Sequence, residues 1–289
     1  MIERTARLIA ITAAVLGVIV LIGAALSSNV QPDADAYWHA ALRLRDGQAL
    51  YGGPLGDETE IYRYAPWFAF AWVPLTYLGQ GGAYLVWRTI LVGSTLLAVW
   101  PLLRRPSAAS VTLVVLVGGL LLSNLPAGNV TPLIVGVLVV GVRSRAGPLL
   151  LGLAASLKLF PLVLLAGYLA ERRWIAAVVA TMVTAVLWLT VLAFDVSLYL
   201  RMGQPTFYVG GISLFAVSPI LWLPVALVAV AVVLGLAVRG SRWTWLAAGA
   251  AIPLAVPRVW LPDAAYVLIG LVILPLVVRR RPIPGAAPD

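Results

Sequence analysis

Apolar runs follow one another from near the start of this chain to near its end, separated by short polar segments. Most runs are roughly 15 to 22 residues long, which is about the length a helix needs to cross the ~30 Å hydrocarbon core of a bilayer. Backbone groups inside lipid have to form their hydrogen bonds within the segment, so these runs are expected to be helices. The pattern therefore predicts an all-α polytopic membrane protein.

Two of the apolar runs carry internal breaks. The run 65–78 is short and contains Pro66 and Pro74, so we expect a re-entrant or interfacial segment there. The run 147–170 contains Lys158-Leu159-Phe160-Pro161, and because proline removes a helix hydrogen bond, a broken hairpin is predicted. The other runs are expected to cross or nearly cross the membrane, and they cover residues 8–26, 83–103, 108–122, 130–142, 174–194, 219–238, 243–256 and 264–278.

Composition and charge indicate a single integral membrane domain over residues 1–289. Hydrophobic residues make up 62% of the chain and charged residues 11%, and there is no cysteine for a disulfide or a thiolate. The net charge of +9 comes from arginines at the ends of apolar runs, which indicates cytoplasmic anchoring rather than a nucleic-acid partner. We expect a multi-pass plasma-membrane protein with about 8–10 transmembrane or re-entrant helices.

This orientation also predicts which polar segments face outward. The first extracytoplasmic loop covers residues 27–64 and includes a short interfacial helix at 37–45, whereas the tail 282–289 is expected to be disordered in the cytoplasm. A site on the outer side has no direct access to cytoplasmic nucleotide sugars or ATP, and the chain contains no glycine-rich phosphate loop. The polar residues expected on the outer side are Asp33, Asp35, Arg63, Asn129, Arg201 and Asp263.

The acidic stretch at the start of the first outer loop is the first candidate for chemistry. Asp33 and Asp35 lie beside an apolar interface, where desolvation favours a carboxylate as general base. Asp35 suits the N-cap of the interfacial helix, which leaves Asp33 as the candidate catalytic residue. An Asp-x-Asp pair can also hold a divalent ion between substrate phosphates, although the spacing is weakly specific and no metal site or cofactor is assigned. His39, the only histidine, either packs on the amphipathic helix or contacts substrate.

Lys158 is the second candidate, because it is the only lysine and it lies in the middle of an apolar run. A charge at that depth costs several kcal/mol and marks a functional site with an anionic partner. The helix break frees backbone N–H groups that also favour an anion, so we expect a lipid phosphate there. The alternative is a structural pairing with a buried acid or with carbonyls at the helix break.

Other polar and aromatic side chains are further candidates for the site or for the membrane interface. Arg63, between Tyr62 and Tyr64, either binds the same phosphate or extends its guanidinium to the interface, and Arg88 is a second charge inside a span. Asp263 is a further carboxylate that could approach the site from the last outer loop. Three tryptophans are assigned to the interfacial aromatic belt, with sugar stacking as the alternative, above all for the last: Trp67, Trp72 and Trp260.

Five short stretches, taken in order, share the spacing of motifs that occur together in one family. They are Asp33-Ala34-Asp35-Ala36-Tyr37 with Ala40, Ala41, Gly47 and Tyr51; Tyr64-Ala65-Pro66-Trp67-Phe68; Gly128-Asn129-Val130-Thr131; Gly152-Leu153-Ala154 with Lys158 and Pro161; and Pro257-Arg258-Val259-Trp260. Together they resemble glycosyltransferase family 87, and they cover most of the chain. The family's histidines after the tryptophan are replaced here by Pro262-Asp263.

The resemblance implies a GT-C-like bundle and a polyprenyl-phosphate-mannose donor used at the outer face of the membrane. It places the family's general base on Asp33. We combine the resemblance with the residue-by-residue interpretation into one expected substrate-binding set: Asp35, Tyr37, His39, Arg63, Tyr64, Asn129, Lys158, Trp260 and Asp263.

The resulting hypothesis is a membrane glycosyltransferase that moves a hexose, mannose by analogy, onto an extracytoplasmic glycolipid or glycan by inverting transfer. Its partners would be the polyprenyl-phosphate-linked sugar, the acceptor and the lipid bilayer. Two alternatives stay open at this point: a transporter or flippase of lipid-linked sugars, whose broken helices would line a path, and a catalytically inactive relative of the family.

Overall fold

The computed structural model describes residues 31–51, 62–104, 108–195, 212–257 and 259–279, together with four helical positions (12, 15, 19 and 23) of the first apolar run. Four predictions lie wholly or partly outside these residues. They concern most of the helix at 8–26, much of the first outer loop, Arg201, and the tail 282–289.

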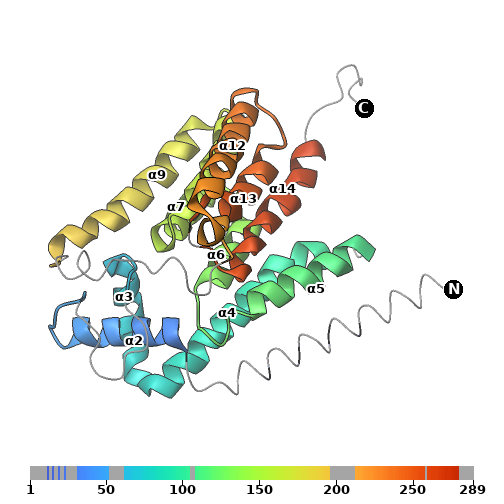
Figure 1. Cartoon of the computed structure of the whole chain (residues 1–289). Helices are drawn as coiled ribbons and strands as arrows, with labels where there is room; N and C mark the ends of the chain where they lie inside the picture. Colours follow the sequence, from blue (N-terminus) through green and yellow to red (C-terminus); the bar gives the residue numbers. More distant parts are fainter. Residues whose placement is uncertain are drawn as a thin grey trace.

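Every regular element in the described part of the chain is a helix, as the pattern predicts (Figure 1). The α-helices are α2 (Pro32–Arg45), α3 (Pro66–Trp72), α4 (Gly79–Leu103), α5 (Ala108–Leu122), α6 (Thr131–Gly141), α7 (Gly147–Leu157), α8 (Leu165–Ala170), α9 (Trp174–Leu189), α11 (Leu214–Val217), α12 (Pro219–Val238), α13 (Thr244–Ala255) and α14 (Val267–Arg279). Short 3-10 helices are η1 (Val73–Leu78), η2 (Phe160–Leu164), η3 (Thr190–Ala193) and η4 (Leu261–Tyr266).

Three stretches of helix in the described residues are long and apolar enough to cross a membrane, namely Pro66–Leu103, Trp174–Ala193 and Pro219–Val238. The first of these bends at Gly79, whose backbone has φ 71° and ψ 163°, so α3 with η1 forms a piece separate from α4. Left-handed backbone of this kind favours glycine, which has no Cβ to clash. Shorter apolar helices make up most of the remaining bundle.

The predicted break in the run 147–170 is confirmed. α7 ends at Leu157, Lys158 has extended backbone (φ −137°, ψ 128°), and η2 and α8 follow. The two ends of the run meet, because a Cβ added at Gly147 would lie 2.8 Å from the Tyr168 hydroxyl. Tyr168 in turn donates a hydrogen bond to the Val142 carbonyl at 2.5 Å. The chain therefore returns to the end of the bundle from which it started.

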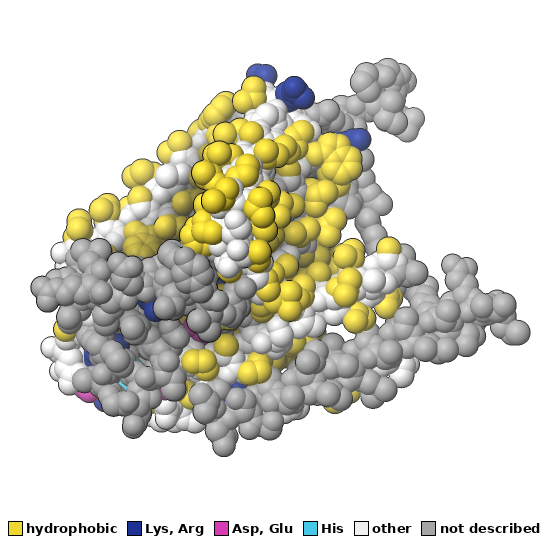
Figure 2. Space-filling model, viewed as in Figure 1, with side chains coloured by type: hydrophobic (Ala, Val, Ile, Leu, Met, Phe, Trp, Pro, Cys, Tyr) yellow, Lys and Arg dark blue, Asp and Glu magenta, His cyan; other side chains and the backbone are white. Residues whose placement is uncertain are grey.

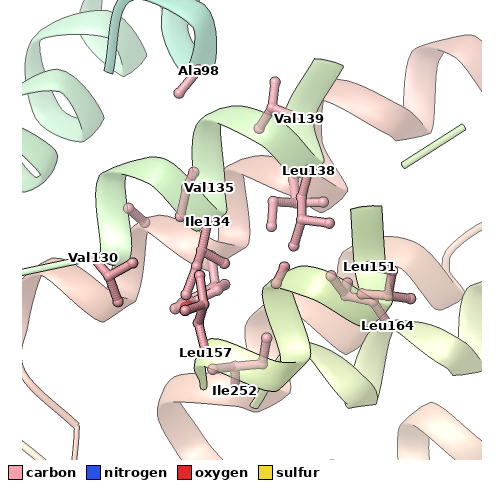
Figure 3. Packing of buried hydrophobic residues seen from close by; sticks show 14 of the residues in the cluster. Ala98, Val130, Ile134, Val135, Leu138, Val139, Leu151, Leu157, Leu164 and Ile252 are labelled. Carbon is pink, nitrogen blue, oxygen red and sulfur yellow. The ribbon is translucent and has the colours of Figure 1, made fainter. Parts of the chain in front are cut away.

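Close backbone contacts hold the centre of the bundle together. α4 packs against both α5 and α6, and at Gly136 an added Cβ would lie 2.3 Å from the Ser94 carbonyl oxygen. Small residues allow apolar helices to approach in this way, so that van der Waals packing replaces the missing hydrophobic driving force in lipid. The buried cluster around α6 and α7 includes Ile134, Leu138 and Leu151 (Figure 3).

The helix predicted at 37–45 begins earlier, at Pro32, and this corrects the prediction that Asp35 is its N-cap. Gln31 occupies the cap position, and Pro32 starts the helix because its fixed φ suits the first turn and its missing N–H leaves no donor unpaired. Asp33 and Asp35 both lie in the first turn, where negative charge is favourable near the positive end of the helix dipole.

Candidate functional site

The turn between α5 and α6 positions the start of α2. The backbone N–H of Asp33 donates to the Ala127 carbonyl at 2.9 Å, and the Trp87 indole donates to the Gly128 carbonyl at 2.7 Å. Gly128 has φ 70°, and an added Cβ would lie 2.6 Å from the Cβ of Ala34. Only glycine satisfies both the left-handed backbone and this close approach. The turn therefore places Asn129, the next residue, beside the first turn of α2.

Asn129 connects two parts of the candidate site. Its Nδ2 donates to Asp33 Oδ2 at 2.9 Å, and its Oδ1 accepts the backbone N–H of Thr131 at 3.0 Å. Asp33 is half-buried, so the amide holds one of its oxygens at the edge of the core. These contacts bring together Asp33 and Asn129, two of the residues singled out in the sequence.

Lys158 and Asp263 form a buried ion pair next to that amide. Lys158 Nζ lies 3.1 Å from Asp263 Oδ1 and donates to Thr131 Oγ1 at 2.7 Å. The Lys158 side chain is 13% exposed and that of Asp263 only 2%. An ammonium group has three donors, and two of them are directed to these oxygens. Asp263 thus comes close to Lys158, and the two side chains form an ion pair, one of the structural pairings expected for this lysine.

Thr131 links the ion pair to the Asp33–Asn129 pair, although the sequence analysis did not assign it a role. Its hydroxyl lies 2.8 Å from Asn129 Oδ1 and 2.9 Å from Asp263 Oδ1. A hydroxyl carries a single hydrogen, so it donates to one of these two acceptors at a time while it accepts from Lys158. The sequence signals for Thr131 were its place in the Gly128–Thr131 stretch and at the start of a helix, before Pro132.

The residues just before η4 support Asp263 from the other side. Its Oδ2 accepts the backbone N–H of Trp260 at 3.0 Å, and its own backbone N–H donates to the Trp260 carbonyl at 2.9 Å. Trp260 precedes η4 and its side chain remains 39% exposed. The indole is therefore partly exposed, while the backbone of the same residue fixes the buried carboxylate.

Asp35 belongs to a different cluster. It is buried, and its Oδ1 accepts from the Tyr84 hydroxyl at 2.7 Å and from Gln80 Nε2 at 3.0 Å. His39 Nδ1 lies 3.4 Å from the same oxygen. Residues two apart on an α-helix point about 200° away from each other, which explains why Asp33 and Asp35 face different partners. No group of three or more His, Asp or Glu suited to a metal ion occurs in the described part of the chain.

Aromatic side chains pack around Tyr37, which lies on α2 with both acids. Tyr37 is buried, donates to the Tyr64 hydroxyl at 2.9 Å and makes edge contacts with Phe68, Trp72 and Trp87. Burial, followed by the nearby Tyr64 and Asp33, raises the pKa of Tyr37 well above its usual value of 10, so it remains a neutral donor.

The assignment of two tryptophans to an interfacial belt needs correction. Trp72 is 1% exposed, because α3 turns it into the aromatic cluster with Trp87. Trp67 is half-buried and its indole donates to Ser156 Oγ at 3.0 Å, tying α3 to α7.

Arg63 is half-buried in the segment that leads into α3. Arg88 is buried near Gln31. With the Gln31 amide in the orientation that suits both groups, its oxygen accepts two hydrogen bonds from the Arg88 guanidinium, at 3.1 Å and 3.2 Å.

Comparison of this chain with protein-family models, with curated proteins and with solved structures gives no match. A half-buried carboxylate can accept a proton, and an ammonium held by two oxygens retains one donor for an anion. One amide and one hydroxyl connect the two groups.

Proposed function

We propose that this chain is a membrane glycosyltransferase that moves a hexose, mannose by family resemblance, from a polyprenyl phosphate to a glycolipid or glycan acceptor with inversion. The observation that carries the proposal is the hydrogen-bonded chain from Asp33 through Asn129 and Thr131 to Lys158. It joins a candidate base to a candidate phosphate-binding group, which are the two functions that such a transfer requires.

In the proposed reaction Asp33 accepts the proton of the acceptor hydroxyl. The acceptor oxygen forms a bond to the anomeric carbon as the bond from that carbon to the phosphate oxygen breaks on the opposite face. The electron pair leaves with the polyprenyl phosphate, and Lys158 stabilises the growing negative charge with its third N–H. Asn129 and Thr131 hold the two groups at a fixed separation, which supplies orientation.

Asp263 would tune the charge at Lys158. Without substrate, its carboxylate neutralises the ammonium, which would otherwise be costly in an apolar bundle. When a phosphate approaches, the Thr131 hydroxyl can donate to Asp263 while Lys158 turns toward the ligand. In this proposal Asp263 stands at the place where the family resemblance leads one to expect histidine.

The lipid part of the donor would need an apolar surface that begins near the site. A groove of about 460 Å³ runs between α12 and α13 and is lined by apolar side chains such as Pro224, Val228, Ala251 and Leu254. Leu254 lies in the last turn of α13, shortly before the segment that leads to Trp260. We assign this groove to the prenyl chain, and the bundle itself to the plasma membrane with the site on the outer side.

The test compares mannose transfer by the unmodified chain and by the Asp33→Asn variant, each in membranes that are supplied with radiolabelled polyprenyl-phosphate-mannose. Loss of a general base is expected to lower transfer by about 10²–10⁴-fold. The matched control is Asp46→Asn at the C-cap of the same helix, where the side chain is 47% exposed and pairs only with Arg45 among the described contacts. Unchanged transfer in Asp33→Asn would remove Asp33 as the base, and no transfer by the unmodified chain would refute the glycosyltransferase proposal.

One observation favours a transporter of lipid-linked sugars as the second candidate. Lys158 is a half-buried charged residue in extended backbone between α7 and η2, and broken helices with charges inside the bundle are common at transport sites. An assay of transport across the membrane of proteoliposomes, with a fluorescent lipid-linked sugar, distinguishes the transporter from the glycosyltransferase. A transporter would move the lipid-linked sugar even as the Asp33→Asn variant, and it would not release polyprenyl phosphate.

A further inference from the structure

Three turns that lie far apart in the sequence meet at one end of the bundle. They connect α6 to α7, α8 to α9 and α12 to α13. The Trp245 indole donates to Glu171 Oε1 at 2.8 Å, and a Cβ on Gly240 would lie 3.3 Å from the Ala170 carbonyl oxygen. The hydrogen bond from Tyr168 to the Val142 carbonyl connects the α6–α7 turn to the end of α8, and so to the other two turns.

Glu171 neutralises the inner arginines of this end. Its carboxylate pairs with Arg143 through Oε1 and lies 3.9 Å from the Arg173 guanidinium through Oε2. The remaining arginines of the three turns point outward: Arg145, Arg172, Arg239 and Arg242 are all exposed. We call these four residues, with the neighbouring Trp174 and Trp243, the basic face.

The backbone at Arg172 is unusual for the residue that stands there. It has φ 56°, and it is the only residue other than glycine with a positive φ among the described residues. Glycine or asparagine would adopt this conformation with less strain at the end of a helix. An arginine at such a position adds charge to the face at a conformational cost, which is consistent with a role for its guanidinium.

Apolar side chains directly border the basic face. Val238 is 90% exposed and Ile175 81% exposed, and each neighbours an arginine or a tryptophan of the face. Figure 2 shows Lys and Arg side chains at the upper end of the molecule, above a broad hydrophobic surface. A partner for this region has to combine negative charge with an apolar part. Nucleic acids and acidic peptides offer only the charge, whereas a phospholipid offers both.

We propose that the basic face binds the phosphate groups of anionic phospholipids. Guanidinium groups match phosphate oxygens with paired hydrogen bonds, and several arginines from separate helices can surround one headgroup. Trp174 and Trp243 place amphipathic rings at the level of the headgroups, and the Arg242 guanidinium lies 5.6 Å above the Trp243 ring. The sequence indicated only that arginines end apolar runs, whereas the folded chain gathers four of them into one surface.

This proposal is independent of the glycosyl transfer reaction and can be tested without it. The full chain in neutral detergent is titrated with phosphatidylglycerol or with phosphatidylcholine, and lipid retention is counted by native mass spectrometry. Tighter retention of phosphatidylglycerol is expected, with a loss of affinity at raised salt because exposed charges are screened.

The informative variant is Arg239→Gln with Arg242→Gln. Each basic residue near a lipid surface is expected to contribute about fivefold in affinity, so the pair should lose about 25-fold for phosphatidylglycerol. The charge-preserving pair Arg239→Lys with Arg242→Lys should retain most of the affinity. Arg45→Gln removes one exposed arginine outside the basic face and should change nothing.

Two results would overturn the proposal. One is equal retention of phosphatidylcholine and phosphatidylglycerol by the unmodified chain, and the other is unchanged phosphatidylglycerol affinity in the double glutamine variant. If that variant does not fold, Arg145→Gln in a different turn keeps the test open, with about a fivefold loss expected and an unchanged affinity refuting the role of the face.

Discussion

Breaking the Lys158–Asp263 pair should destabilise the fold even if substrate is never present. In Lys158→Met the Asp263 carboxylate, 2% exposed, loses its cationic partner and keeps the Thr131 hydroxyl and the Trp260 N–H as donors. Removing one partner of a buried pair costs about 3–5 kcal/mol, and since two donors remain, we expect a loss near ~3 kcal/mol. Asp263→Asn, which keeps the shape, should cost a similar amount by leaving the ammonium unpaired.

The two changes together should cost less than their sum. Lys158→Met with Asp263→Asn removes both charges, and neutral replacements of a buried pair are often close to neutral in stability. The double variant should therefore unfold at a higher temperature than Lys158→Met alone. This positive coupling is the signature of a direct interaction in a double-mutant cycle.

The assay is thermal unfolding of the purified protein in detergent, followed by the fluorescence of its 11 tryptophans. A loss of ~3 kcal/mol should lower the melting temperature by about 6–12 °C at about 2–4 °C per kcal/mol. The control is the surface pair Arg45–Asp46, 2.9 Å apart with side chains 34% and 47% exposed, where Arg45→Met should leave the melting temperature unchanged. The buried-pair argument would be refuted if the two single variants had the melting temperature of the unmodified chain. It would also be refuted if the stability losses of the two single variants added up to that of the double variant.

Two further stability predictions use the same assay. Gly128→Ala should cost about 2–4 kcal/mol, because its backbone has φ 70° and the new Cβ would lie 2.6 Å from a Cβ on α2, whereas Gly119→Ala in open space should not destabilise. Equal melting of the two alanine variants would contradict the docking of the α5–α6 turn. Tyr84→Phe should cost about 1–3 kcal/mol by removing the 2.7 Å hydrogen bond to buried Asp35, and Tyr77→Phe, at a side chain 75% exposed, should be silent. A silent Tyr84→Phe would show that Asp35 does not need this donor.

The positions of the helices could largely be predicted from the sequence. α5, α12 and the break after Leu157 lie where the apolar runs and prolines indicate. Such features depend on the length of an apolar run and on proline chemistry, both of which are local. Run length also predicts more membrane-spanning helices than the three that are long enough in the described residues, so the full number of spans stays a prediction.

The first turn of α2 shows where local reasoning failed. A cap residue at Asp35 is a reasonable choice for a helix at 37–45, but Pro32 extends the helix because the α5–α6 turn accepts the N–H of Asp33. Which acid faces Asn129 and which faces Tyr84 then follows from helix geometry. That outcome depends on a contact between segments distant in the sequence, and no local pattern encodes it.

The sequence by itself determined an all-helical chain of apolar runs, its single lysine in a broken helix, and a set of polar residues predicted for one side. The tertiary structure decided how they meet. Asp33 and Asn129 are 96 residues apart, Lys158 and Asp263 are 105 apart, and Thr131 reaches Asp263 across 132 residues. Hydrogen bonds act over about 3 Å, so only the packing of whole helices can bring such pairs into contact, and it also gathers the basic face.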